Sequence, residues 1–309
     1  MPYYLGIDGG GTKTTCALGD ESQLLAAATA GPSNIVRVGE QRARESLHQC
    51  VREACAAAGI APAQIARTCV GGSGAGRPEL AKKARGILGE LLTTPVVVVG
   101  DMEIALEAAF DAGPGVIVIA GTGSIAYGRN SEGKTARAGG WGFAIGDEGS
   151  AHWIGRAVVS AVLRVADENH ATTEGTEKSL LAAALCEVWQ VGSLIELARF
   201  ANSSPPPDFA ALFPAVSASS DELARELQIG AGRELARIAA IVIGRLFAGA
   251  DRAMVRVAMT GSVFRYGPLV REAFYNELRR LDARADIIPT IVEPVEGALR
   301  MARRAATGS

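Results

Sequence analysis

The sequence predicts an α/β fold of two domains, each built on a mixed β-sheet. Its 309 residues are about twice the length of a common domain, so two hydrophobic cores are expected. Strand-like runs come first and are followed by alternating helical and strand-like segments. The same order starts again after the breaker cluster Gly113-Pro114-Gly115, which we take as the boundary between the domains.

The first domain is expected over residues 1–113. Three short apolar or β-branched runs separated by turns open it, which is typical of antiparallel strands. Apolar residues then recur every three or four positions from Glu40 to Ala58, which predicts an amphipathic helix that Gly59 ends. The predicted strands are 3–8, 13–18, 23–30, 65–70 and 95–99, and the predicted helices are 40–58, 78–92 and 102–112.

The second domain is expected over residues 114–293. A buried strand-like run, a glycine turn and a second strand-like run repeat the opening pattern of the chain. The remainder is mostly helical, and a stripe of leucine, isoleucine and valine supports its longest helix. The predicted strands are 116–120, 124–128, 134–138 and a last one near 254–259, and the predicted helices are near 150–167, 177–188, 192–200, 221–249 and 267–281, with a terminal helix from about 294. A cleft between two such domains is a common ligand site.

The composition excludes several classes of protein. With 31 basic and 33 acidic side chains the net charge is −2, so we expect neither a nucleic-acid nor a membrane partner. The apolar runs are far shorter than the roughly 18 residues that span a bilayer, and no signal peptide is apparent, so a cytoplasmic location is expected. The five cysteines are scattered without a Cys-x-x-Cys pair, which predicts free thiols rather than disulfides or a zinc site.

Three glycine turns are candidates for phosphate binding. Gly9-Gly10-Gly11-Thr12 joins the first two strands, and its uncovered backbone N–H groups and hydroxyl could contact an anion. Asp8 precedes it and could reach a phosphate-bound Mg²⁺. A second turn, Gly121-Thr122-Gly123-Ser124, opens the repeated unit, and Gly261-Ser262 follows the strand near 254–259. This recurrence indicates a divided nucleotide site, with a plain glycine-rich hairpin as the alternative for the first turn.

The segment from Gly128 to Thr135 has the residue spacing of a P-loop. A P-loop requires a helix that starts at its Lys-Thr pair, so that the helix N-terminus faces the phosphate. Here three glycines follow between positions 139 and 142 and oppose a helix. The segment therefore predicts a hairpin turn at Asn130-Ser131-Glu132-Gly133.

Two further stretches could bind a sugar and activate it. In the glycine-rich stretch 139–150, Trp141 offers an apolar platform and Asp147 a hydroxyl acceptor, with helix capping as the alternative role of Asp147. Asp101 ends a buried apolar strand, where ligands of α/β sheets bind, and is the candidate general base. Its alternative role is the N-cap of the next helix. Asn34 is a weaker polar candidate, and the alternative is that its loop is an ordinary turn without a binding role.

The Gly121-Thr122-Gly123-Ser124 turn and the stretch from Gly139 to Ser150 resemble those of the actin-like sugar kinases of the hexokinase and heat-shock ATPase superfamily. The sequence is most similar to the N-acetylglucosamine kinase branch, which shares the BadF/BadG/BcrA/BcrD ATPase-type domain. The resemblance runs from Gly6 to about Ala298. It implies two actin-like (ribonuclease H-like) lobes with an interdomain nucleotide and sugar cleft, and a terminal helix over about 294–309 that packs back on the first lobe.

The resemblance also implies roles for individual residues. In the first phosphate loop it places Asp8, Gly10, Gly11 and Thr12, with Asp8 near the Mg²⁺ of bound ATP. The second loop comprises Gly121, Thr122 and Gly123, while Gly261 and Ser262 border the adenosine. Asp101 takes the proton from the sugar 6-hydroxyl as it attacks the γ-phosphate. The residues that hold the sugar are Asn34, Asp101, Ser124, Gly140, Trp141 and Asp147.

The activity that this resemblance implies is that of an ATP:sugar phosphotransferase with ATP and Mg²⁺ as cofactors. The expected reaction converts N-acetylglucosamine to N-acetylglucosamine 6-phosphate, and a glucosamine kinase or an N-acetylmuramic acid/N-acetylglucosamine kinase is the alternative. A non-catalytic sensor is more remote. A reductase-activating ATPase is also remote, because no cysteine between Cys69 and Cys186 can hold its iron–sulfur cluster. Dimers are common among proteins of this kind, so a homodimer is expected.

Overall fold

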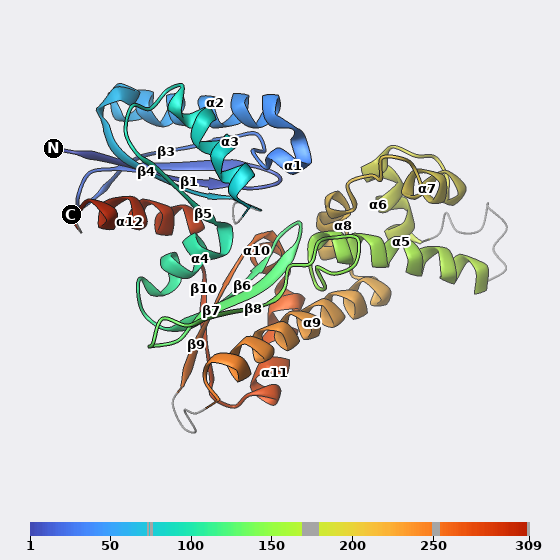
Figure 1. Ribbon diagram of the computed structural model, residues 1–309. Helices are drawn as coiled ribbons and strands as arrows, with labels where there is room; N and C mark the ends of the chain where they lie inside the picture. Colours follow the sequence, from blue (N-terminus) through green and yellow to red (C-terminus); the bar gives the residue numbers. More distant parts are fainter. Residues whose placement is uncertain (73, 75–76, 169–178, 249–253, 308–309) are drawn as a thin grey trace. The chain divides into compact units, whose positions relative to one another are not determined.

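The computed structural model describes residues 1–72, 74, 77–168, 179–248 and 254–307. Its internal contacts divide the chain into two compact units. Unit 1 comprises Met1–Ile117 together with Val292–Ser309, and unit 2 comprises Val118–Ile291. The structure contains two five-stranded sheets (Figure 1), and both pair some strands parallel and others antiparallel. The predicted α/β fold with two mixed sheets is confirmed.

The sheet of unit 1 has the strand order β3-β2-β1-β4-β5. Its strands are β1 (Tyr3–Gly9), β2 (Thr14–Gly19), β3 (Leu24–Ala30), β4 (Ile65–Gly72) and β5 (Val96–Gly100). The first three pair antiparallel, as short turns allow, whereas β4 and β5 pair parallel after helical crossovers. Gly9 lies beside Gly72 and Gly72 beside Gly100. The three parallel strands β1, β4 and β5 therefore end side by side, and we call the side of the sheet where their carboxyl ends lie its carboxyl edge.

Helices cover both faces of this sheet (Figure 1). They are α1 (Ile35–Val38), α2 (Glu40–Ala58), α3 (Pro78–Gly89), α4 (Asp101–Phe110) and α12 (Pro294–Thr307), with a 3₁₀ turn at Pro62–Gln64. Neighbouring strand residues point to opposite faces, so Leu5 packs against α2 and α3 while Tyr4 packs against α4 and α12. Unit 1 therefore has two apolar layers, one on each side of its sheet.

The terminal helix α12 belongs to unit 1, although the rest of unit 1 lies at the other end of the chain. A Cβ atom on Gly6 would overlap the backbone of Leu299, so helix and strand approach as closely as a glycine allows. Arg303 donates hydrogen bonds to the carbonyl oxygens of Asp20 (2.7 Å) and Gln23 (2.9 Å), which anchors α12 to the β2–β3 turn. Helix α12 thus packs on the sheet of unit 1, for the residues up to 307.

The sheet of unit 2 has the order β10-β9-β6-β7-β8. Its strands are β6 (Gly115–Ala120), β7 (Ser124–Arg129), β8 (Thr135–Gly139), β9 (Val255–Thr260) and β10 (Ala285–Ile291). The helices are α5 (Ala151–Glu168), α6 (Leu180–Trp189), α7 (Leu194–Ala201), α8 (Phe213–Ala218), α9 (Glu222–Leu246), α10 (Ser262–Tyr266) and α11 (Pro268–Leu281), with a 3₁₀ turn at Phe209–Leu212. Helix α9 packs on β7 and β8, and α11 packs on α9.

The two sheets repeat one another in the order in which the chain builds them. In each sheet three consecutive strands lie side by side, and the two later strands are added on the other side of the first. This confirms the repeat of architecture predicted from the sequence. The antiparallel pairing of β7 with β8 around the Asn130 turn also confirms the hairpin that the P-loop-like segment was expected to form.

The predicted strands and long helices agree with the observed ones to within a few residues, and only their predicted ends at 177, 249 and 309 lie outside the described residues. The prediction that the strand near 254–259 is the last one is wrong, because β10 follows it. This strand contains Pro289, which has no N–H to donate. Its position at the edge of the sheet makes the proline tolerable, since one side needs no partner.

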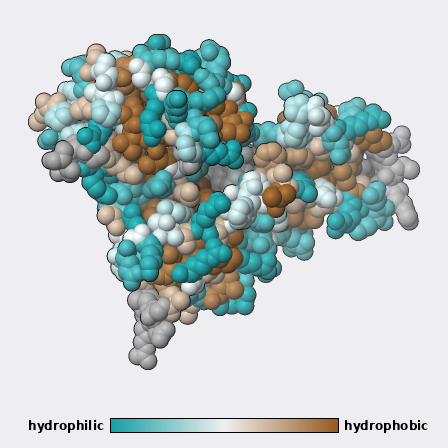
Figure 2. Space-filling model, viewed as in Figure 1, coloured by the Kyte–Doolittle hydropathy of each residue, from teal (hydrophilic) through white to brown (hydrophobic). Residues whose placement is uncertain are grey.

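Among the described residues, no single helix is long and apolar enough to cross a membrane. Helices α6 and α7, bent by 51° at their junction, pass the same length and composition test as a pair. Three of their leucines, Leu181, Leu185 and Leu197, are buried in the protein, as in helices that pack in a core. In Figure 2 the surface that α5 to α8 form shows hydrophobic residues beside hydrophilic ones.

Candidate active site

The first glycine turn joins β1 to β2 in unit 1. The N–H of Gly10 donates to the carbonyl oxygen of Lys13 (3.0 Å), which closes the turn. The carbonyl oxygen of Gly10 in turn accepts from the N–H groups of Ser33 (3.2 Å) and Asn34 (3.3 Å). A Cβ atom on Gly10 would lie 2.9 Å from the Lys13 oxygen, so this position requires glycine. These hydrogen bonds fix the backbone of the turn, and Gly11 and Thr12 stand between the two residues that close it.

Asp8 is the last residue but one of β1 and is half-buried. Its pKa is raised from 3.8 to about 7, first by burial and then by the negative charge of Asp101. Lys13 opposes this shift, and Glu293 of the C-terminal segment adds to it. A carboxylate in such surroundings gains from a nearby cation, because a positive charge offsets both the burial and the repulsion.

Asp101 follows β5 and is the first residue of α4. Its carboxylate accepts the N–H of Met102 (2.9 Å), while Glu103 accepts the N–H of Gly100 (2.6 Å) and so completes the cap of the helix. The alternative of Asp101 as the N-cap residue is thus wrong by one position, since Gly100 is the N-cap. The parallel register places Gly9 and Gly100 on either side of Gly72, which brings Asp8 and Asp101 to the same sheet edge.

Asn34 precedes the short helix α1 and acts as its N-cap. Its side-chain oxygen accepts from the N–H groups of Val36 (3.1 Å) and Arg37 (3.3 Å). Because the oxygen is used in this way, the amide nitrogen is the group that Asn34 can offer to a ligand. The structure thus gives Asn34 a capping role and, in addition, the orientation of a hydrogen-bond donor.

The second glycine turn joins β6 to β7 in unit 2. The N–H of Gly121 donates to the carbonyl oxygen of Gly123 (2.9 Å). The carbonyl oxygens of Gly121 and Thr122 accept from Ala151 (2.8 Å) and His152 (3.3 Å) at the start of α5. The first residues of α5 thus hold the glycine turn in place. The backbone conformation of the glycine turn therefore depends on the stretch that leads into α5.

Asp147 lies against this second turn. A Cβ atom on Gly123 would be 2.7 Å from Oδ2 of Asp147, so only glycine leaves room for the carboxylate. Oδ1 of Asp147 accepts the N–H of Gly142 (3.3 Å), and its φ of 60° is in the left-handed region. Burial raises the pKa of Asp147, while the N–H groups of Gly142 and Ser124 lower it. Ser150, rather than Asp147, caps α5, since its hydroxyl accepts the N–H of Trp153 (3.1 Å).

The stretch 139–150 presents aromatic and apolar side chains to solvent. Trp141, Phe143 and Ile145 are 67%, 55% and 82% exposed, respectively. The guanidinium of Arg137 lies 4.8 Å from the centre of the Trp141 ring, a cation–π contact that orients the indole. Ser124 donates its hydroxyl hydrogen to the carbonyl oxygen of Glu148 (2.7 Å), which ties the stretch to β7. The predicted residues Ser124, Gly140, Trp141 and Asp147 therefore belong to one local unit.

The third turn lies beside the second. Gly261 has a φ of 106°, and a Cβ atom there would overlap the carbonyl oxygen of Ala120, so glycine is needed both for conformation and for space. Ser262 then starts α10.

The site residues predicted from the sequence form two groups. One is in unit 1, with Asp8, Gly10, Gly11, Thr12, Asn34 and Asp101, and the other is in unit 2, with Gly121 to Ser124, Gly140, Trp141, Asp147, Gly261 and Ser262.

Sequence reasoning missed Lys13, Glu103, Arg137 and Glu293. Lys13 and Glu293 shift the pKa of Asp8, and Glu293 is distant in sequence, so no local pattern could have linked it to Asp8. Glu103 stands three residues after Gly100, a capping-box spacing that could have been found. Within the described residues no group of three or more His, Cys, Asp and Glu could hold a metal ion.

Curated relatives of this chain are sugar kinases. The N-acetylmuramic acid/N-acetylglucosamine kinase of Clostridium acetobutylicum is 37% identical over 54% of this chain, a match that spans 56% of that kinase. The N-acetyl-D-glucosamine kinase of Dictyostelium discoideum is 28% identical over 97% of both chains.

Solved structures share the fold. A provisionally assigned N-acetylglucosamine kinase of Chromobacterium violaceum has a TM-score of 0.74 at 24% identity, over 98% of this chain and 99% of the other. A ROK family glucokinase of Streptomyces griseus, solved with glucose and AMPPNP, has a TM-score of 0.62 at 16% identity, over 98% and 99%. At these identities the likeness concerns the fold alone. The family model for BadF/BadG/BcrA/BcrD ATPases matches residues 5–302, and the chain therefore belongs to the BadF/BadG/BcrA/BcrD ATPase family.

Proposed function

We propose that this protein is an ATP-dependent kinase that phosphorylates an amino sugar at its 6-hydroxyl, with N-acetylglucosamine as the foremost substrate. The observation that carries the proposal is the pair Asp8 and Asp101 at one sheet edge, beside a glycine turn of fixed backbone. Phosphoryl transfer depends on positioning and on charge neutralisation, and a carboxylate commonly accepts the proton of the attacking hydroxyl. Membership of the ATPase family and the names of both curated relatives support the same reaction.

In this proposal Asp101 is the general base. Its position after β5 leaves it at the carboxyl edge of the sheet, where a sugar hydroxyl could approach. Thr12 and the N–H of Gly11 contact the phosphates of ATP from unit 1, in the turn that the Gly10–Lys13 hydrogen bond closes. In unit 2 the turn at Gly121 to Gly123 has the same task, and Gly261 and Ser262 border the adenosine.

The sugar-binding side chains differ in chemistry. Asn34 donates through its amide nitrogen, while Asp147 accepts hydroxyl hydrogens through its carboxylate. Trp141 supplies an apolar face that suits the C–H groups of a sugar ring. Ser124 and Gly140 complete this set from the same local unit.

We also propose Mg²⁺ as the cation that acts with ATP. Asp8 fits such an ion, because its pKa is raised to about 7 by burial and by Asp101, and a divalent cation would offset both effects. Oxygen ligands are those that Mg²⁺ prefers, and its remaining ligands would be phosphate oxygens and water. When bound, the ion neutralises the negative charge that develops on the phosphates during transfer.

The test is ADP release from ATP in the presence of N-acetylglucosamine, glucosamine, N-acetylmuramic acid, N-acetylmannosamine or glucose, with and without Mg²⁺. Strong stimulation by N-acetylglucosamine and none by its 6-deoxy analogue is expected. Release that no sugar stimulates, in a protein that still binds ATP, would contradict the proposal. Equal stimulation by N-acetylmuramic acid would favour the second candidate, an N-acetylmuramic acid/N-acetylglucosamine kinase, which the 37% identity to the Clostridium acetobutylicum enzyme supports.

We place this kinase in the cytoplasm as a homodimer. The five cysteines, all of them free thiols, are compatible with a reducing compartment. Light scattering on the purified chain tests the dimer, with a mass of twice 31.9 kDa as the expected result and 31.9 kDa as the contrary one.

A further inference from the structure

The side chain of Arg37 lies against the first glycine turn. A Cβ atom on Gly11 would be 3.3 Å from Nη1 of Arg37 and 3.5 Å from its Cδ atom, so both the guanidinium and the stem of this arginine run along Gly11. Arg37 stands in α1, which follows the turn only after β2 and β3. The fold therefore brings a positive charge to a turn for which we propose phosphate binding.

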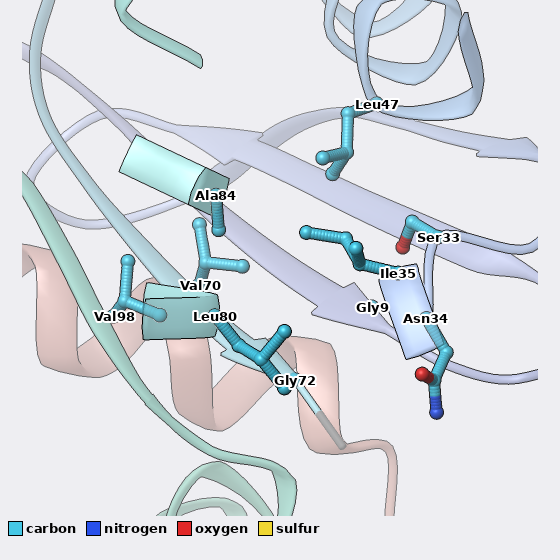
Figure 3. Close-up of a pocket in the computed structure, with 10 residues that line it drawn as sticks. All are labelled: Gly9, Ser33, Asn34, Ile35, Leu47, Val70, Gly72, Leu80, Ala84 and Val98. Carbon is cyan, nitrogen blue, oxygen red and sulfur yellow. The ribbon is translucent and has the colours of Figure 1, made fainter. Parts of the chain in front are cut away.

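Three features hold α1 in this place. The N–H groups of Ser33 and Asn34 donate to the carbonyl oxygen of Gly10 (3.2 and 3.3 Å), so the segment before the helix is tied to the turn itself. Figure 3 shows Ile35 turned into the apolar pocket of unit 1, whereas the side-chain amide of Asn34 points away from the other labelled residues. The N–H of Arg37 donates to the carbonyl oxygen (2.9 Å) and to the side-chain oxygen (3.3 Å) of Asn34. The backbone of Arg37 is thus fixed relative to the turn, while its side chain is exposed.

The carboxyl edge beside this turn is acidic. Asp8 and Asp101 both lie there, and the negative charges of Asp101 and Glu293 raise the pKa of Asp8. MgATP is itself an anion, so a site that binds it at this edge needs positive charge from the protein as well. Lys13 acts on Asp8. The guanidinium of Arg37 adds a positive charge on the turn, and its planar set of N–H groups matches the oxygens of a phosphate.

Arg37 also stands between the two groups that the proposed reaction joins. Gly11 is on the phosphate side, and Asn34, a candidate sugar-binding residue, starts the same helix one turn earlier. The γ-phosphoryl group of ATP has to pass from the phosphate side to the sugar hydroxyl. Stabilisation of the helix dipole explains the position less well, because α1 has only four residues.

We propose that Arg37 is a further catalytic residue, whose guanidinium contacts the γ-phosphoryl group of ATP and stabilises its charge during transfer. This inference rests on the proposed kinase function and adds to it a residue outside the glycine turns and the sugar-binding set. In the step, the bond from the γ-phosphorus to the β–γ bridging oxygen breaks and the bond to the sugar 6-oxygen forms. The hydroxyl proton passes to Asp101, and Arg37 stays charged throughout.

Arg37→Met tests the contact, because it removes the charge and keeps a long stem. It is expected to lower kcat for N-acetylglucosamine by about 10²- to 10³-fold, the range for loss of one donor to a transition state. It should also weaken binding of AMPPNP, which carries a γ-phosphoryl group, by roughly tenfold, while the affinity for ADP changes by less than about twofold. Arg37→Lys keeps the charge without the planar fork and should recover part of both losses. Steady-state kinetics and calorimetry measure these effects.

Arg52→Met is the matched control, because Arg52 is an exposed arginine further along the chain in α2 and the change in charge is the same. It should leave kcat and both nucleotide affinities unchanged. If Arg37→Met leaves either kcat or the ratio of AMPPNP to ADP affinity unaltered, the role of Arg37 is refuted and the kinase function stands. A loss confined to N-acetylmuramic acid would assign Arg37 to the carboxylate of that sugar and refute the role equally. A wild-type chain that phosphorylates no sugar would overturn both.

Discussion

The carboxylates of Asp8 and Asp101 share one sheet edge but differ in their surroundings. Asp8 is half-buried, and its pKa is raised to about 7 by burial and by Asp101. Asp101 begins α4 and accepts the N–H of Met102. Asp8 therefore gains most from a cation, whereas Asp101 is held in a fixed orientation by the helix that it starts. This difference supports the division of roles proposed for them, one with the metal ion and one with the sugar hydroxyl.

Asp101→Asn is expected to lower kcat by a factor of about 10² to 10⁴, because the amide cannot accept the proton of the 6-hydroxyl. Sugar and ATP affinities should stay within a few-fold, since the side chain keeps its size. Single-turnover kinetics together with equilibrium binding separates the two effects. Glu103→Ala is the control: it removes the cap on Gly100, which costs about 1 kcal/mol of stability, and should leave kcat unchanged. Unaltered turnover in Asp101→Asn would refute the base role.

Asp8 also predicts how stability depends on pH. Its pKa is higher in the folded chain, about 7, than the ordinary 3.8, so between these pH values the folded chain holds a proton that the unfolded chain releases. The free energy of unfolding therefore decreases as the pH rises through this window. Asp8→Asn should thus stabilise the metal-free protein at pH 8 by up to about 4 kcal/mol and have little effect below the ordinary pKa. Urea denaturation over the pH range measures it.

Asp20 provides a comparison of opposite sign. Hydrogen bonds from the N–H groups of Ser22 and Gln23 lower its pKa from 3.8 to about 2. Its stabilising contribution is therefore present above its ordinary pKa and is lost as the pH falls toward 2. Asp20→Asn should destabilise the chain at neutral pH in the same denaturation series. If both substitutions had the same sign at neutral pH, the assigned environment of Asp8 would be wrong.

For single residues, sequence reasoning could predict which residue types belong to the site but not how their side chains are placed. The capping alternative for Asp147 fails because Ser150 takes that position, three residues later along the chain. Asp147 has a left-handed backbone conformation, and its carboxylate lies against Gly123, which is 24 residues away in sequence. Asn34 combines capping with a free amide nitrogen, and only the orientation of its side chain shows that both are compatible.

The second glycine turn and the stretch 139–150 form a structural element of their own. Hydrogen bonds from Ala151 and His152 hold the turn, and the hydroxyl of Ser124 holds the stretch at Glu148. The residues of unit 2 for which we propose phosphate binding and sugar binding are therefore held together by hydrogen bonds. A change in one is expected to displace the other.

Gly123→Ala tests this connection. The added methyl group would lie 2.7 Å from Oδ2 of Asp147, so the carboxylate must move. An overpacked contact costs about 1–3 kcal/mol, and we expect KM for the sugar to rise by roughly tenfold or more. Gly244→Ala in α9, where a methyl group meets no atom within 4 Å, is the matched control and should leave KM unchanged. A normal sugar KM in Gly123→Ala would separate Asp147 from sugar binding.

Elements with strong periodicity were predictable, and short or irregular ones were not. The strand-turn-strand pattern at the start of each unit and the long helix α9 follow from local sequence. Strand β10 contains Asp286 and Pro289, which both disfavour strands, and it forms because β9 and α11 provide a partner and a cover. The short helices α1, α8 and α10, of four to six residues, are too short to show a period in the sequence, and of these three only α1 has a side-chain cap, from Asn34.

At the scale of the whole molecule, the C-terminal helix α12 packs against the strands at the start of the chain. Helix α12 closes the second apolar layer of unit 1, where Ala298, Leu299 and Ala302 pack with Tyr4 and Cys69. Arg304 pairs with the buried Glu107 of α4. These contacts link α12 to residues between Tyr4 and Glu107, so unit 1 is complete only when α12 is in place.

Removal of α12 tests this dependence. A chain that ends at Ile291 is expected to expose Cys69, whose thiol is fully buried and whose pKa burial raises to about 12. Labelling with a thiol reagent under native conditions should be rapid in the truncated chain and slow in the full one. Leu299→Ala is the graded variant, with an expected loss of about 2–5 kcal/mol in the free energy of unfolding. Protection of Cys69 in the truncated chain would show that unit 1 folds without α12.

The place of α12 also sets an order of assembly during synthesis. A ribosome makes the strands of unit 1 first, but the helix that covers one of their faces emerges only after all of unit 2. At about 5–20 residues per second, translation leaves that apolar face without its cover for roughly ten seconds or more. The half of the protein that is made first is thus the half that finishes last, and a nascent-chain chaperone would find its binding site there.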